Sequence, residues 1–198
     1  MGIRQTFLMN FALLSSNAPS VRYLCTMQYD HLIYRVAQPS DLPAVQSIVA
    51  GAVRRLAKAG IDQWQQGYPD TEILAEDLRL GRGRLLCTDD RVVAYGALVT
   101  TGEPTYAVIE GAWLTADEEY LVLHRLCVAE VAVGCGVARR WMERVEQEAT
   151  ASGFRSIRVD TRAENHIMQR LLERLGYQPC GSIRIEGEPF LAFEKLLA

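Results

Sequence analysis

The spacing of apolar positions along this chain switches repeatedly between the two-residue period of a strand and the three- to four-residue period of a helix. Short apolar runs bounded by polar turns predict strands at residues 33–37, 105–114, 120–128 and 156–160, and hairpins at 84–99 and 177–197. Helical spacing predicts helices at residues 42–59, 71–80, 137–149 and 167–175. Because helices and strands alternate, this order predicts one α/β domain in which helices flank a mixed central sheet.

A short glycine turn connects the strand at 120–128 to the helix that follows it. Gly134, Gly136 and Ala138 keep bulky side chains out of the turn, so consecutive backbone N–H groups can point at one ligand beside the positive end of the helix. The turn therefore predicts a cradle for a phosphate or pyrophosphate, with a plain tight connection as the alternative. It lacks the Gly-Lys-Ser/Thr of a kinase-type P-loop, and Arg139 stands where a dinucleotide fold has a third small residue.

Residues 126–138, with the sequence LCVAEVAVGCGVA, resemble the acetyl-CoA signature of the GNAT superfamily of N-acetyltransferases. In that family a strand ending in Leu-x-Val precedes Arg/Gln-x-x-Gly-x-Gly/Ala, and Val133 takes the place of the Arg or Gln. The resemblance implies a GNAT-like fold that uses acetyl-CoA and no metal, with pantetheine beside the strand and pyrophosphate on the turn. The cofactor-binding residues that it implies are Leu126, Cys127, Val128, Val133, Gly134, Gly136, Val137, Ala138, Arg139 and Asn165.

A second segment, residues 160–177, resembles the Asn-x-x-Ala…Gly-Phe segment of the same family, with Asn165, Gly176 and Tyr177 in register. Many family members have a tyrosine seven residues after this asparagine, which protonates the departing thiolate. Leu172 occupies that position here. Likeness to a bacterial subgroup of the family extends over most of residues 33–197.

His124 is the first candidate for the base that takes a proton from the amine, because the usual pKa of histidine is near 6.5. Regular strand alternation predicts that it shares a face with Leu126 and Val128. A buried imidazole with a purely structural hydrogen bond is the alternative. Asp160 can act as the base instead, or can orient His124. Glu110 is a weaker candidate that we group with the substrate-binding residues, with a solvated surface position as its alternative.

Cys180 is the candidate general acid in place of the missing tyrosine, with water as the donor or a small core cysteine as the alternatives. The resemblance implies direct transfer, so no cysteine nucleophile is expected. Substrate selection is assigned to residues 59–72, where Trp64 and Tyr68 are costly to leave on a solvated loop. Packing of these aromatics between helices is the alternative.

Composition narrows the class of protein further. A chain of 198 residues that is 49% hydrophobic can bury one substantial core, and none of its apolar runs approaches the ~20 residues of a membrane span. The net charge of −3 argues against a nucleic-acid partner, whereas a homodimer stays open. Five scattered cysteines without a C-x-x-C pair predict reduced thiols, no zinc site and a cytoplasmic protein.

Residues 1–32 are predicted to be an N-terminal extension to a domain over residues 33–198. A disordered tail, or a start of translation at Met27, is favoured over a signal peptide or a myristoylation site at Gly2.

Two functions follow from these patterns. The first is an acetyl-CoA-dependent N-acetyltransferase that acts by direct transfer on a primary amine of a small molecule or peptide. The second is a catalytically weak acyl-CoA-binding module that serves as a sensor or partner. Val133 and Leu172 favour the second, whereas His124, Asp160 and Asn165 favour the first.

Overall fold

A computed structural model describes residue 29 and residues 31–116 and 119–198. The predicted N-terminal extension therefore lies almost wholly outside the described residues. Tyr29 is buried, and its hydroxyl donates a hydrogen bond to the carbonyl of Val131 over 3.1 Å. None of the helices in the described ranges is long and apolar enough to cross a membrane.

Apart from the strand predicted at residues 105–114, the predicted elements are present with small shifts at their ends. The strands are β1 (Ile33–Val36), β2 (Gly83–Cys87), β3 (Val92–Val99), β4 (Ile109–Gly111), β5 (Tyr120–Val128), β6 (Ser156–Thr161), β7 (Gln178–Ile185) and β8 (Glu188–Leu196). The α-helices are α2 (Leu42–Lys58), α3 (Thr71–Arg79), α4 (Val137–Ala151) and α5 (His166–Arg174). Short 3-10 helices are η1 (Pro39–Asp41), η2 (Pro104–Ala107) and η3 (Glu130–Ala132).

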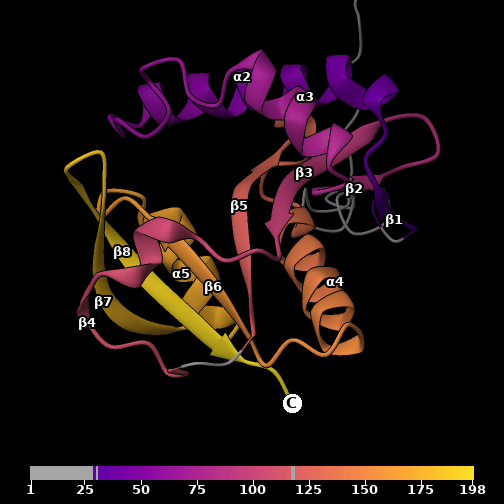
Figure 1. Cartoon of the computed structure of the whole chain (residues 1–198). Helices are drawn as coiled ribbons and strands as arrows, with labels where there is room; N and C mark the ends of the chain where they lie inside the picture. Colours follow the sequence, from indigo (N-terminus) through magenta and orange to yellow (C-terminus); the bar gives the residue numbers. More distant parts are fainter. Residues whose placement is uncertain (1–28, 30, 117–118) are drawn as a thin grey trace, which may run out of the picture.

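The described strands form one mixed sheet of eight strands in the order β1-β2-β3-β5-β6-β8-β7-β4. Neighbouring strands are antiparallel except β5 and β6, which are parallel. These two strands pair only from Tyr120–Leu123 to Ser156–Val159, and beyond that point they diverge toward the side where α2 crosses the molecule (Figure 1). The carboxyl-terminal half of β5 therefore has an edge that β6 does not cover.

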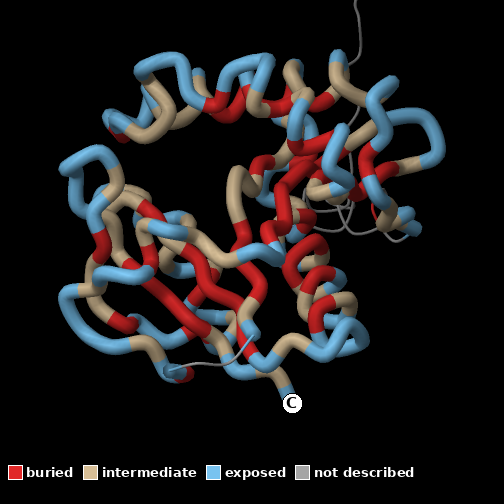
Figure 2. The backbone as a smooth tube through the Cα atoms, in the orientation of Figure 1, coloured by how far each residue is buried: buried red, intermediate tan, exposed pale blue. Residues whose placement is uncertain are grey.

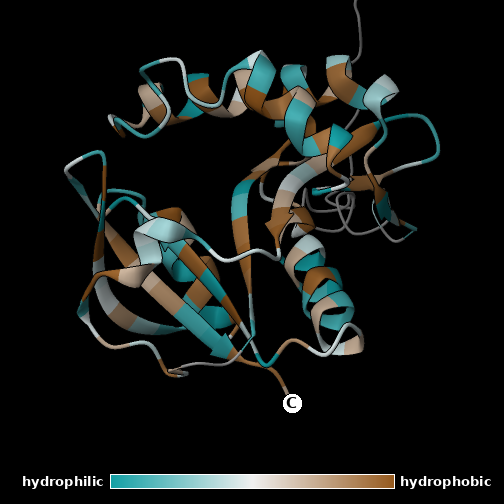
Figure 3. Ribbon diagram, in the orientation of Figure 1, coloured by the Kyte–Doolittle hydropathy of each residue, from teal (hydrophilic) through white to brown (hydrophobic). Residues whose placement is uncertain are grey.

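Helices cover both faces of the sheet, as the apolar spacing predicts. Helices α2 and α3 pack on one face of β2 and β3, while α4 and α5 pack on the opposite face against β3, β5, β6 and β8. Figure 2 shows the buried positions on the inward faces of these elements, and Figure 3 shows that most of the same positions are hydrophobic. Apolar residues at a spacing of four form a fully buried stripe on α4, which consists of Val137, Trp141, Val145 and Ala149.

The strand predicted at residues 105–114 is mostly wrong. Its first half is the 3-10 helix η2, where the carboxylate of Glu103 accepts a hydrogen bond from the N–H of Thr105. Only the three residues of β4 pair, antiparallel to β7. A proline in the first helical position and a capping carboxylate favour a helical turn over an extended strand.

Helical spacing of the apolar residues would place Ile167 on the buried face of α5, but Ile167 is 74% exposed. This residue lies in the first turn of a short helix that begins at His166, whereas Leu172 in the middle of the helix is fully buried.

A β-bulge in β5 overturns the predicted face of His124. Arg125 has a φ of 59°, and the pairing of β3 with β5 shifts register at this point. Because one extra residue reverses the alternation of side chains, Leu126 and Val128 pack toward α4, while Cys127 packs toward α2. His124 thus faces away from Leu126 and Val128.

Candidate functional site

The glycine turn between β5 and α4 has the backbone conformation of an anion cradle. Gly134 and Gly136 have φ angles of 80° and 76°, and Gly136 is the N-cap of α4. The first backbone N–H of this helix with a main-chain partner belongs to Arg140, which bonds to the carbonyl of Gly136. Within the described residues, the N–H groups of Gly136, Val137 and Ala138 have no main-chain acceptor. These donors suit a phosphate at the positive end of a 15-residue helix.

The open edge of β5 leads directly into this cradle. The N–H of Ala129 bonds to the carbonyl of Val93 on β3. Since backbone groups alternate between the two edges of a strand, those of Leu126 and Val128 face the edge that β6 leaves open. The carbonyl of Val128 accepts a hydrogen bond from the Nη2 atom of Arg55 over 2.6 Å. The other groups on this edge suit an extended amide chain such as pantetheine.

The side chains around the cradle contribute less than the family pattern predicts. Val133 is 50% exposed and brings no charge, and the guanidinium of Arg139 is paired with Glu143 over 2.7 Å. Cys127 is buried, and burial raises the pKa of its thiol to about 12. The prediction of reduced thiols is right for Cys127 and wrong for Cys135, which is disulfide-bonded.

His124 lies between two carboxylates at the point where β5 and β6 separate. Its Nε2 atom is 3.3 Å from the Oε2 atom of Glu103, and its Nδ1 atom is 3.9 Å from the Oδ1 atom of Asp160. The hydroxyl of Tyr106 donates a hydrogen bond to the same Asp160 oxygen over 2.6 Å. Glu103 at the start of η2, Tyr106 in η2, His124 on β5 and Asp160 on β6 are distant in the sequence. Together they form one polar cluster.

The pKa values of the two carboxyl groups in this cluster are shifted in opposite directions. Contact with His124 holds the pKa of Glu103 at about 2, so Glu103 is ionised at neutral pH. Burial raises the pKa of Asp160, against the opposing effect of His124. A buried carboxyl group with a raised pKa beside a histidine is a common arrangement for proton transfer.

Two of the predicted substrate-binding residues lie in the loop between α2 and α3. Tyr68 is 42% exposed, and the centre of its ring is 5.7 Å from the guanidinium carbon of Arg125. Trp64 packs against the apolar core between α2 and β3. Asn165 caps α5 by accepting a hydrogen bond from Met168, and its amide donates to the side chain of Gln63 in the same loop over 2.9 Å.

Within the described part of the chain, neither Glu110 nor Cys180 forms a hydrogen bond or ion pair with His124, Glu103 or Asp160, although Cys180 packs in the same apolar cluster as Tyr106. Glu110 is exposed on β4 and is paired with Arg184 over 3.4 Å. Cys180 is buried on β7, and its sulfur atom lies 3.5 Å from the carbonyl of Gln178. Burial raises the pKa of the Cys180 thiol, with a further contribution from nearby Glu194.

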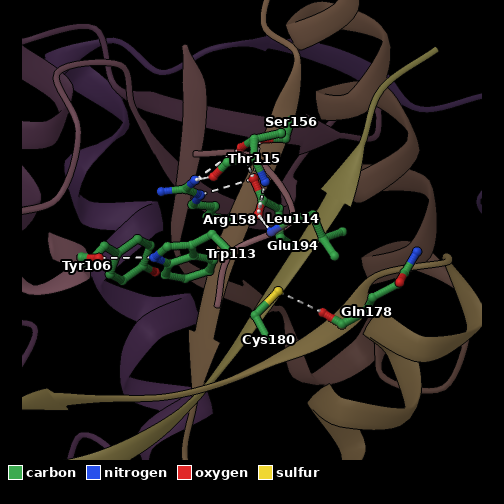
Figure 4. A network of polar contacts seen from close by, with 9 residues as sticks. All are labelled: Tyr106, Trp113, Leu114, Thr115, Ser156, Arg158, Gln178, Cys180 and Glu194. Atoms are coloured by element: carbon green, nitrogen blue, oxygen red, sulfur yellow. Dashed lines mark hydrogen bonds and ion pairs between the residues drawn. The ribbon is translucent and has the colours of Figure 1, made fainter. Parts of the chain in front are cut away.

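Cys180 borders a buried polar network, which Figure 4 shows at close range. The carboxylate of Glu194 accepts hydrogen bonds from Ser156, Thr115 and Arg158. The guanidinium of Arg158 also stacks over the rings of Trp113 and Tyr120. The donors to Glu194 lie on the segment that follows β4 and on β6, so this network joins those two parts of the chain to β8.

Sequence reasoning missed Glu103, Tyr106 and Arg125. Glu103 and Tyr106 belong to a Gly-Glu-Pro turn and to a segment that was predicted as strand. The one local signal for the first two was Gly102 before Glu103-Pro104, which is typical of a turn and not of a continuous strand.

Comparison with known proteins agrees with this geometry. The sequence profile of the acetyltransferase (GNAT) family matches residues 52–177. No curated protein sequence matches the chain. A GNAT-family acetyltransferase from Streptococcus agalactiae is 29% identical, with a TM-score of 0.78 over 85% of this chain and 96% of its own.

Two more distant structures share the fold. The ribosomal-protein-alanine N-acetyltransferase of Brucella melitensis is 21% identical, with a TM-score of 0.62 over 83% of this chain and 99% of its own. A Salmonella typhimurium protein solved with its cofactor acetyl-CoA is 16% identical, with a TM-score of 0.61 over 85% and 95% of the two chains. The chain therefore belongs to the GNAT family of acetyltransferases, which use acetyl-CoA.

Proposed function

We propose that this protein is a cytoplasmic N-acetyltransferase that transfers an acetyl group directly to a primary amine of a small molecule or peptide. The observation that carries the proposal is the position of His124 between Glu103 and Asp160, beside the open edge of β5. Acetyl-CoA, when bound, supplies the acetyl group as a thioester. The cradle at the start of α4 would bind its pyrophosphate, and Leu126 and Val128 would pair with its pantetheine.

The polar cluster of Glu103, His124 and Asp160 suits the chemistry of an amine acceptor. Most primary amines carry a proton at neutral pH, and this proton must leave before the nitrogen attacks. The amine nitrogen then bonds to the acetyl carbon as the carbon–sulfur bond breaks, and His124 or Asp160 takes the proton that the nitrogen loses. Glu103 stabilises the imidazolium that forms on His124, because its own pKa of about 2 keeps it ionised.

Water is our proposed proton donor to the departing thiolate. Leu172, at the position of the family tyrosine, is fully buried in the apolar core, and Cys180 directs its sulfur toward the carbonyl of Gln178. Leu172 has no proton to donate, and Cys180 remains the side-chain alternative to water.

The buried Leu172 and the uncharged Val133 also support the second candidate, an acyl-CoA-binding module with weak turnover. One assay separates the two functions. Thiol release from acetyl-CoA is measured across a panel of primary amines, alongside calorimetry with acetyl-CoA alone. Turnover that rises with one class of amine and falls in His124→Ala or Asp160→Asn supports the enzyme. Tight binding of acetyl-CoA with no amine-dependent thiol release in any arm would leave the binding module.

A further inference from the structure

Arg125 immediately follows His124 and occupies the bulge of β5. Its φ of 59° is a left-handed backbone conformation that residues other than glycine rarely adopt. Such strain persists where surrounding contacts hold it, and it is concentrated at functional sites. The side chain of Arg125 is only 11% exposed, so a permanent positive charge is held close to the cluster around His124.

The guanidinium of Arg125 has hydrogen-bond donors that the described residues do not use. Its Nε atom is 3.3 Å from the Oδ2 atom of Asp77, which places the two charges together. That carboxylate oxygen already accepts a hydrogen bond from the hydroxyl of Tyr95 over 2.7 Å. The Nε and Nη1 atoms of Arg125 are both buried and have no aligned acceptor in the described part of the chain. Buried donors of this kind are rare in folded proteins, because each one costs its full desolvation energy.

Tyr68 lies between Arg125 and the acidic cluster. Its ring lies over the guanidinium. Burial raises the pKa of its hydroxyl; Arg125 lowers this pKa, whereas the carboxylates of Asp160, Asp77 and Glu103 raise it further. The site below the α2–α3 loop therefore has two ends of opposite charge. Glu103 and Asp160 form the negative end, and Arg125 forms the positive end.

A hollow of about 400 Å³ borders Arg125 on the side of α3 and also contains Glu72, Glu76 and Arg82. In this hollow the charges of Glu72, Glu76 and Asp77 outnumber that of Arg82. We therefore place a bound anion on the side of Tyr68, whose ring lies over the guanidinium.

We infer that Arg125 binds a carboxylate of the acceptor, so that the acceptor is an amino acid or a short peptide with a free carboxylate. This inference rests on the proposed amine acetylation. The planar guanidinium fork matches a carboxylate in geometry and charge. The amine of such an acceptor lies at the negative end, beside His124, and its carboxylate lies at the positive end, under or beside the ring of Tyr68. Asp77 holds the guanidinium in position and offsets part of its charge.

The test compares acids with their uncharged amides. Alanine, β-alanine, lysine and glycylglycine are each paired with the corresponding carboxamide. Binding of each compound to the protein saturated with coenzyme A is measured by calorimetry, and acetylation is measured separately by thiol release. We expect at least one acid to bind about 30-fold or more tightly than its amide, because the amide leaves the charged donors of Arg125 unpaired.

Three variants assign the effect to one side chain. In Arg125→Gln the ratio of acid to amide affinity should fall to near one, while Arg125→Lys should keep an intermediate ratio. Arg82→Gln is the matched control, because it removes an arginine from the neighbouring hollow and should keep the wild-type ratio. Acetyl-CoA affinity should stay unchanged in all three variants, which also shows that they fold.

The outcomes separate this inference from the proposed function. Equal affinity for acid and amide in every pair, no binding of any acid, or an unchanged ratio in Arg125→Gln would overturn the role of Arg125. Acetylation of the amides as fast as the acids would overturn it while leaving amine acetylation intact. A preference for acids that Arg125→Gln abolishes, without any thiol release, would support the carboxylate site and contradict the proposed transfer.

Discussion

The Nε2 atom of His124 lies 3.3 Å from the Oε2 atom of Glu103. This contact joins the middle strand of the sheet to the 3-10 helix that precedes β4. It holds the Nε2 edge of the imidazole against a carboxylate that is ionised at neutral pH. Because the other ring nitrogen faces Asp160, the imidazole has a fixed orientation at the place where β5 and β6 separate.

Replacement of His124 tests its role as the base. His124→Ala should lower kcat by about two to four orders of magnitude, and should leave acetyl-CoA affinity nearly unchanged, because the cradle lies at the far end of β5. Steady-state kinetics and calorimetry measure the two quantities. Wild-type turnover in His124→Ala, with collapse in Asp160→Asn, would transfer the role to Asp160. Wild-type turnover in both variants would mean that the site works by positioning alone.

Asp160→Asn should separate stability from activity. Burial raises the folded-state pKa of Asp160 above its usual value of 3.8, so ionisation of this carboxyl opposes folding as the pH rises through the folded-state pKa. An asparagine oxygen can still accept the hydrogen bond of Tyr106. At pH 7 the variant should therefore unfold at the same temperature as the wild type or higher, while its kcat falls. A large loss of melting temperature at pH 7 contradicts this account.

Glu103→Gln should lower the stability of the protein at neutral pH, and this loss should become smaller as the pH falls. The pKa of Glu103 is about 2 in the folded protein, against a usual value of 4.5, so its contribution to stability is complete above pH 4.5 and disappears as the pH falls toward 2. Urea unfolding of the wild type and the variant at pH 7, 5 and 3 measures the difference. We expect the wild type to be more stable at pH 7 and 5, with the gap narrowing at pH 3. A gap that does not depend on pH would point to lost packing.

Gly136→Val should weaken acetyl-CoA binding about tenfold or more, because a β-branched residue at a φ of 76° costs roughly 1–2 kcal/mol and displaces the turn. A Cβ atom at this position meets open space, so the backbone conformation and not crowding is responsible. Gly153→Val is the matched control, with a φ of 85° and equally open space at the other end of α4. Calorimetry should show weakened binding in Gly136→Val alone. Similar losses in both variants would indicate a general effect on the fold.

Glu194→Ala should destabilise the protein without acting on the cofactor. The carboxylate is fully buried and pairs with Arg158 over 3.0 Å, and removal of one partner of a buried pair costs about 3–5 kcal/mol. Glu188→Ala is the control, because Glu188 lies on the same strand as Glu194 and forms an exposed ion pair with Arg162. This variant should be as stable as the wild type. Urea unfolding measures both variants. Stability close to the wild type in Glu194→Ala would show that the network contributes little.

Local sequence was enough to predict the glycine turn and the helix that follows it, where we propose that the cofactor binds. The conformation of the turn depends on Gly134 and Gly136, and the start of α4 depends on residues within one turn of them. The buried stripe on α4 follows from a spacing of four residues along one helix. Each of these features is decided by neighbours in the chain, so periodicity and turn chemistry were sufficient.

The acceptor side was decided only by tertiary structure. Glu103, His124 and Asp160 meet because strand order brings η2, β5 and β6 together, and strand order depends on long-range packing that local periodicity does not encode. The bulge at Arg125 reversed the predicted face of the residues after it. Gly96 lies opposite this bulge, where Trp141 packs so closely that a Cβ atom would fall 2.5 Å from its ring. The sequence by itself thus determined the conformation of the turn that we propose as the cofactor cradle, and the folding of distant segments onto β5 determined which side chains surround His124.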